Sequence, residues 1–229
     1  MPRYPYSVPD VASIGRLLGD ESRAAMLIAL MDGRAWTVGE LAAQLEIAKS
    51  TATAHAHQLV DGGLCVEARQ GRHRYLRLAD TDVAEAVEAL GMLSGRTLSP
   101  PRTLAAGTKD EALRAGRTCY GHLAGRLGVD LLTSLRRIEV VTTNGELGPN
   151  GAEWFTALGV SPGPSRRPAL RACLDWTERR DHLAGSYADA LCRRLLDASW
   201  LERSRNTRAV RLTEAGRAAL AQRGVTLSV

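Results

Sequence analysis

The feature that most constrains the fold is a pair of short amphipathic segments, followed at once by a basic hairpin, within residues 37–78. Thr37 and Glu40 have the spacing of a capping box, which predicts the start of one helix. A second helix is expected from Ser50, as its N-cap, to about Asp61, where two glycines follow. Two short helices joined by a tight turn are typical of a helix-turn-helix motif.

The residues after this pair predict a two-stranded ribbon with a basic tip. Residues 64–68 have strand-like composition, and residues 75–78 alternate between apolar and polar side chains. Between them lie Arg69, Arg72 and Arg74, next to a glycine that suits a turn. A basic ribbon directly after a helix-turn-helix is a wing, so the N-terminal part is expected to be a winged helix-turn-helix domain.

Helices are also predicted on both sides of this motif. Residues 11–18 are apolar at helical spacing, and Asp20 is a plausible N-cap for a helix that follows. Residues 81–94 carry apolar side chains at helical spacing and would close the domain. We therefore place the first domain at residues 1–95.

The second helix of the motif and the wing carry side chains suited to DNA. Short donors and acceptors on a helix can reach base edges in the major groove, and basic side chains suit phosphates or the minor groove. Residues 47–79 hold five basic and two acidic residues, although residues 1–95 as a whole hold nine basic and twelve acidic ones. The candidate DNA-binding residues are Lys49, Ser50, Thr51, Thr53, His55, Gln58, Arg69, Arg72 and Arg74.

Residues 10–95 resemble the ArsR/SmtB family of winged-helix repressors. The resemblance is carried by Leu18-Gly19-Asp20-Glu21-Ser22-Arg23, Thr37-Val38-Gly39-Glu40-Leu41-Ala42, Ser50-Thr51-Ala52-Thr53-Ala54-His55, residues 59–64 and Gly71-Arg72-His73-Arg74-Tyr75-Leu76. It implies a homodimer that pairs through the first and last helices of the domain. It also implies a pseudo-palindromic double-stranded operator read by two recognition helices, and repression rather than activation.

The metal sites of that family are not recognisable here. Its soft-metal sensors carry cysteine in the helix before the recognition helix, where this chain has Val38-Gly39-Glu40-Leu41-Ala42-Ala43. Its zinc sensors use aspartate and histidine in the last helix, and residues 81–85 supply carboxylates but no histidine. The sequence therefore identifies no cofactor.

Composition excludes several other classes of protein. No stretch approaches the roughly 20 apolar residues of a membrane span, and the first residues lack the features of a signal peptide, so we expect a cytoplasmic protein with reduced thiols. The sequence contains no phosphate-binding Gly-x-x-x-x-Gly-Lys loop, no Gly-x-Ser-x-Gly elbow and no His-Glu-x-x-His motif. An enzyme is not expected.

The C-terminal half contains an internal repeat. Residues 96–116 are expected to be a linker, because they include Pro100-Pro101 and show little periodicity. His122-Leu123-Ala124-Gly125 recurs as His182-Leu183-Ala184-Gly185, and a predicted ribbon of residues 200–213 is again wing-like. We expect a mainly α, α+β protein, in which residues 117–229 form two pseudo-repeated winged-helix-like lobes.

These lobes suggest an effector-sensing domain, since small-molecule sites favour the junctions between lobes. The candidate residues are Cys119, His122, Cys173, Trp176 and His182. Cys119 and His122 would share one face of a helix, whereas Cys173 and His182 would lie on opposite faces, which disfavours a symmetric four-ligand metal site. Three roles for these residues remain possible: a metal site at Cys119 and His122, a pocket for a non-metal ligand, or a packing motif that lets two helices approach.

The sequence thus predicts a homodimeric, sequence-specific DNA-binding regulator with a C-terminal domain that senses an unknown effector, and no membrane partner. The alternative is a ligand-, metal- or thiol-redox-sensing interaction protein whose N-terminal domain serves mainly for dimerisation.

Overall fold

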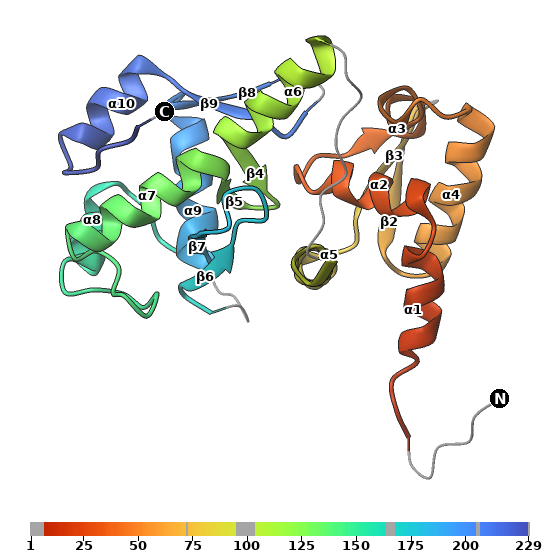
Figure 1. Ribbon diagram of the computed structural model, residues 1–229, viewed down its shortest axis with the longest axis horizontal. Coiled ribbons are helices and arrows are strands. Elements are labelled where there is room, and N and C mark those ends of the chain that lie inside the picture. Colours follow the sequence, from red (N-terminus) through yellow and green to blue (C-terminus); the bar gives the residue numbers. More distant parts are fainter. Residues whose placement is uncertain (1–6, 72, 95–103, 164–167, 205–206, 229) are drawn as a thin grey trace. The chain divides into compact units, whose positions relative to one another are not determined.

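The computed structural model describes residues 7–71, 73–94, 104–163, 168–204 and 207–228 (Figure 1). The chain divides into two compact units, Met1–Val87 and Glu88–Val229. Of the predicted linker 96–116, residues 96–103 lie outside the described part, and most of the rest forms a helix. That segment is rich in alanine and carries an ion pair one turn apart, between Arg114 and Asp110, which favours a helix over a connector.

The N-terminal unit is a winged helix-turn-helix fold, as the sequence predicts. Its three strands form one antiparallel sheet in the order β1-β3-β2. The elements are α1 (Val11–Leu18), α2 (Glu21–Leu30), β1 (Trp36–Thr37), α3 (Val38–Leu45), α4 (Lys49–Asp61), β2 (Cys65–Gln70), β3 (His73–Leu78) and α5 (Thr81–Ser94), the last of which crosses the division between the units.

Local capping chemistry explains where these helices begin. The Asp20 carboxylate accepts a hydrogen bond from the backbone of Arg23, and Thr37 and Glu40 form a complete capping box at α3, as predicted. The predicted Ser50 cap is wrong, because α4 begins two residues earlier, with Ala48 at the N-cap and no side-chain cap. Ser50 is therefore exposed within the first turn of α4.

The core of the N-terminal unit is formed by the inner faces of α2, α3 and α4 and by the sheet. Met26, Leu30, Leu41, Leu59 and Leu76 are each fully buried there. Full burial of a leucine or methionine side chain is worth about 1.5–3 kcal/mol. This packing fixes which face of α4 is turned inward.

The C-terminal unit repeats one pattern twice: a hairpin, a helix, a short ribbon and a second helix. The elements are α6 (Leu104–Ala115), β4 (Arg117–Cys119), β5 (His122–Ala124), α7 (Gly125–Arg137), α8 (Gly151–Ala157), β6 (Arg171–Leu174), β7 (Asp181–Ala184), α9 (Ser186–Asp197), β8 (Leu201–Arg203), β9 (Val210–Leu212) and α10 (Glu214–Ala221). The ribbon of the first lobe is a single bridge between Val141 and Leu147, and that of the second is the β8–β9 pair.

The predicted helix around Cys119 and His122 is wrong. These residues end β4 and begin β5 of a tight hairpin, and Tyr120 in the two-residue turn has a φ of 55°. Cys173 and His182 likewise lie on the paired strands β6 and β7. None of these four residues therefore lies on a helix, and in each pair the two residues are cross-strand neighbours.

The two lobes interlock. Helix α7 of the first lobe packs against β7 of the second, α9 packs against β5, and β5 lies beside β7. A single core joins both lobes through residues such as Leu132, Phe155, Leu191 and Leu220. The described helices include none that is long and apolar enough to cross a bilayer.

Candidate functional site

Helix α4 turns one face to the core and the other to solvent. Ala52, Ala56 and Leu59 are buried, at a spacing of four and three residues. Lys49, Ser50 and Thr51 are exposed at the start of the helix. The packing of α4 therefore leaves the predicted polar side chains of its first turn exposed to solvent.

The remaining candidates on α4 are held by neighbouring side chains. The Thr53 hydroxyl donates to the carbonyl of Lys49, 2.7 Å away. His55 is half-buried, and its Nε2 lies 3.9 Å from a carboxylate oxygen of Asp20. The Gln58 side chain accepts a hydrogen bond of 2.6 Å from Arg23. Each of these three side chains therefore already has a partner within the protein.

The ribbon is linked to α4 by one arginine. Arg74 on β3 donates to the Glu67 carboxylate on β2, and its guanidinium lies 2.8 Å from His57 Nε2 on α4. Arg69 is exposed near the tip, 3.6 Å from Glu67, while Arg72 lies outside the described residues. The ribbon and the exposed face of α4 are therefore held side by side, with Glu67 partly neutralising the arginines.

Two helices of the predicted dimer interface expose apolar side chains. None of the residues of α1 is buried, and Val11 is 72% exposed. On α5, Leu93 is 82% exposed and Leu90 is also exposed. Single exposed apolar residues are common on protein surfaces. Here several of them lie on the two helices through which the family resemblance implies pairing, so these helices are candidate surfaces for contact with a second copy.

The C-terminal unit gathers four of its candidate residues into one buried cluster. The two thiols and two imidazoles of Cys119, His122, Cys173 and His182 each offer an atom, and these atoms all lie within 4.8 Å of one another. Each residue is at most 5% exposed, and the rings of His122 and His182 are 5.2 Å apart. The sequence interpretation that disfavoured four converging residues is therefore wrong.

The register of the two hairpins brings these residues together. Cys119 is the cross-strand partner of His122, and Cys173 is the cross-strand partner of His182. Two residues separate the first pair in the sequence and eight separate the second. A constant offset of 60 aligns the histidines but hides the fact that Cys173 is the equivalent of Cys119.

Three carboxylates that were not predicted surround the cluster. Asp189 lies 3.4 Å from His122 Nδ1, and Asp175 lies 3.4 Å from His182 Nδ1. Glu88, at the start of the C-terminal unit, accepts hydrogen bonds from the thiols of both Cys119 and Cys173. Asp175 lies two residues after Cys173 and Asp189 seven residues after His182, whereas Glu88 is 31 positions before Cys119 and its position carried no signal of this proximity.

The cluster raises the pKa of Cys119, His122 and His182. The hydrogen bond with Cys173, together with burial, raises the pKa of the Cys119 thiol to about 12. Burial lowers the pKa of His122, but Asp189 and Cys119 outweigh it and raise that pKa to about 9. The surroundings thus favour the protonated Cys119 thiol and the protonated His122 imidazole at neutral pH.

Trp176 has a different environment from the other four candidates. Its ring is 37% exposed and stacks on the Arg117 guanidinium, 4.7 Å from the ring centre.

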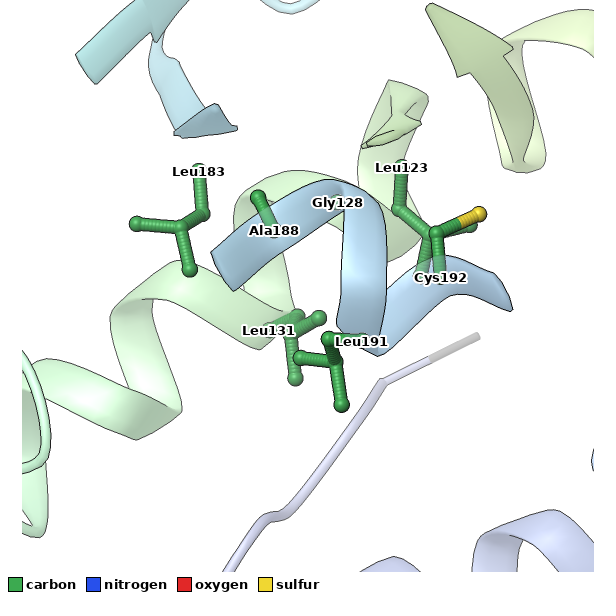
Figure 2. Close-up of a pocket in the computed structure, with 7 residues that line it drawn as sticks. All are labelled: Leu123, Gly128, Leu131, Leu183, Ala188, Leu191 and Cys192. Atoms are coloured by element: carbon green, nitrogen blue, oxygen red, sulfur yellow. The ribbon is translucent and has the colours of Figure 1, made fainter. Parts of the chain in front are cut away.

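Cys192 lines the small apolar cavity drawn in Figure 2, which encloses about 10 Å³ between residues of β5, α7, β7 and α9. That volume holds about one water molecule and is too small for an organic effector.

Comparison with protein families and relatives places the N-terminal unit among known domains. Residues 18–68 match the family described as a helix-turn-helix domain. The chain is 39% identical over 217 residues to YdfF of Bacillus subtilis, named an uncharacterized HTH-type transcriptional regulator, and the match covers 92% of this chain and 95% of that protein.

Two further relatives match a smaller share of the chain. CmtR of Mycobacterium tuberculosis, an HTH-type transcriptional regulator, is 38% identical over 80 residues, covering 35% of this chain and 67% of that protein. The homodimeric winged helix-turn-helix domain of Mb0332 from Mycobacterium bovis superposes with a TM-score of 0.36 at 27% identity, covering 41% of this chain and 93% of that structure.

Proposed function

Because this chain belongs to the ArsR/SmtB-type helix-turn-helix transcriptional regulators, we propose that it is a homodimeric repressor that binds a pseudo-palindromic operator. In this proposal α4 enters the major groove and the ribbon of β2 and β3 grips the adjacent backbone. The C-terminal unit senses an effector that alters DNA binding.

One observation carries the proposal. The Arg74 guanidinium, 2.8 Å from His57, joins the ribbon to the exposed face of α4, so both would meet the same duplex. Lys49, Ser50 and Thr51 at the start of α4 are exposed and available to bases or phosphates. The exposed apolar residues of α1 and α5 support pairing of two copies, which a two-fold operator requires.

Gel-shift titrations against DNA from upstream of the protein's own gene test this function. Arg72→Ala combined with Arg74→Ala should weaken binding to operator and to unrelated DNA alike. The plot of the logarithm of the binding constant against the logarithm of salt concentration should become shallower by about 0.9 for each phosphate that is no longer neutralised. Thr51→Ala should instead reduce the preference for operator, by about 1–3 kcal/mol for each base pair that is no longer read. Arg193→Ala, an exposed arginine of α9, is the control and should leave both unchanged.

The proposal is wrong if the ribbon double variant and Thr51→Ala both bind DNA as the wild type does. Size-exclusion chromatography with light scattering gives the oligomeric state separately. A dimer without DNA affinity would favour an interaction protein whose N-terminal unit only dimerises.

A further inference from the structure

We propose that Cys119, His122, Cys173 and His182 bind a divalent transition-metal ion of the zinc class in a closed, four-coordinate site. The four ligand atoms lie within 4.8 Å of one another. Around tetrahedral zinc, metal–ligand bonds of about 2.0–2.3 Å place neighbouring ligand atoms roughly 3.3–3.8 Å apart. A small contraction of the cluster therefore suffices to reach coordination distances.

The orientation of the histidine rings supports the site independently. Nδ1 of His122 faces Asp189, and Nδ1 of His182 faces Asp175, each 3.4 Å away. All four ring nitrogens are buried and none has a hydrogen-bond partner among the described residues, so each Nδ1 approaches its carboxylate only as an ion-pair contact. Metal-binding histidines characteristically give their second nitrogen to a carboxylate, which fixes the ring and its tautomer.

An unpartnered, buried ring nitrogen is costly to a folded protein. Leaving a buried polar atom unsatisfied costs about 1–3 kcal/mol, and here one ring nitrogen of each histidine lies within 4.8 Å of both thiols. A metal ion would satisfy both nitrogens at once. The geometry is thus explained better by a ligand between the rings than by packing alone.

The donor set selects the class of metal. Two thiolates and two imidazoles suit zinc and related borderline or soft ions, whereas magnesium and calcium require oxygen ligands. Two thiolates also neutralise the charge of a divalent ion, which allows full burial of the site. All four positions are supplied by the protein, as in structural zinc sites.

The position of the site in the fold suggests what it does. Each lobe contributes one cysteine and one histidine from its hairpin, with Cys119 paired to His122 and Cys173 paired to His182. A metal ion would therefore cross-link the two lobes where β5 and β7 meet. Glu88 accepts from both thiols, so their deprotonation on metal binding would also change the hydrogen bonds of this α5 residue.

Elemental analysis and cobalt spectroscopy on the reduced full-length chain test the site. We expect one zinc ion per chain, and one equivalent of Co²⁺ should give thiolate-to-cobalt charge transfer with the strong visible bands of tetrahedral cobalt. Cys119→Ser and Cys173→Ser should each lower the affinity for Co²⁺ at least tenfold. Cys192→Ala is the matched control, because this buried cysteine of the same unit is not among the four ligands, and it should bind Co²⁺ normally.

X-ray absorption on the zinc-loaded wild type covers the case in which a variant fails to fold. It should show two sulfur ligands at about 2.3 Å and two nitrogen ligands at about 2.0–2.1 Å. No uptake of stoichiometric Co²⁺ or Zn²⁺, or a ligand shell without sulfur, overturns the proposal. A Cys119–Cys173 disulfide that forms in air, in protein that never takes up metal after reduction, also overturns it.

The inference does not depend on the proposed DNA binding. The metal measurements use no DNA, and the gel shifts can be run on chelator-treated protein. Failure of one proposal is therefore distinguishable from failure of the other.

Discussion

Arg117 and Asp175 form an ion pair of 2.9 Å in which both side chains are completely buried. Asp175 also accepts hydrogen bonds from the backbone of Gly125 and from Thr177. Burial raises the pKa of Asp175, but His182, Arg117 and these two donors outweigh burial and hold that pKa far below its ordinary value. The pair joins β4 of the first lobe to the loop after β6 of the second. Burying either charge without a partner would strongly destabilise the folded protein.

Asp175→Ala should therefore lower the free energy of unfolding of the C-terminal unit by about 3–5 kcal/mol, because Arg117 is left buried and unpaired. Asp175→Asn retains an acceptor and should cost less. Urea titrations followed by tryptophan fluorescence measure both, since Trp154, Trp176 and Trp200 lie in this unit. Equal, small losses of stability in the two variants would show that the pair is not a structural link.

Gly125 and Gly185 end the repeated His-Leu-Ala-Gly segments, and each turns a strand into a helix. Their φ angles are +74° and +101°, and a Cβ would lie 2.6 Å from the Arg114 carbonyl oxygen and 2.8 Å from that of Ala169, respectively. Each glycine-to-alanine change should cost more than the roughly 1–2 kcal/mol of left-handed strain alone. Gly163→Ala, where a Cβ meets nothing within 4 Å, should be close to neutral in the same thermal melts.

Glu67→Gln should increase the affinity for DNA of any sequence. The Glu67 carboxylate accepts from Arg74 and lies 3.6 Å from Arg69, so its removal frees positive charge on the ribbon. At low salt we expect several-fold tighter binding and a steeper dependence on salt. Fluorescence anisotropy with an unrelated duplex measures this, and unchanged binding would mean that these arginines do not approach the backbone.

The same residue gives a dependence of stability on pH. The hydrogen bond from Arg74 outweighs burial and holds the pKa of Glu67 below its ordinary value of 4.5. The stabilisation is therefore fully present above pH 4.5 and is lost as the pH falls through the lower pKa of the folded state. Glu67→Gln should be less stable than the wild type at pH 7, and the difference should vanish in acid. A constant difference at all pH values would contradict this.

The starts and extents of helices that depend on residues close together in the chain were predicted correctly from the sequence. The capping box of Thr37 and Glu40 and the extent of the helix at residues 11–18 both follow from residues a few positions apart. The start of α4 was misplaced at Ser50, because its N-cap Ala48 makes no side-chain hydrogen bond and leaves no compositional signal.

The arrangement of the cysteine–histidine cluster was mispredicted for the opposite reason. Its members meet through cross-strand register and the interlocking of two lobes, so Cys119 and Cys173 are 54 positions apart. Assigning helical geometry to strand residues then separated side chains that the fold brings together. One signal was present: Arg117-x-Cys119 recurs as Arg171-x-Cys173 ahead of each His-Leu-Ala-Gly. An alignment that allows the hairpin loop to lengthen recovers the equivalence.

Metal removal should destabilise the C-terminal unit. A ligand that binds only the folded state stabilises it in proportion to the logarithm of its concentration over its dissociation constant, about 4 kcal/mol at a thousandfold excess. A chelator strong enough to strip zinc should therefore lower the melting temperature of this unit by about 5 °C or more, and added Zn²⁺ should restore it. In the Cys119→Ser, Cys173→Ser double variant the chelator should have no effect, whereas Cys192→Ala should respond as the wild type does. A wild-type melting temperature that is unchanged by chelation, in protein shown to have lost its metal, would mean that the ion does not cross-link the two hairpins.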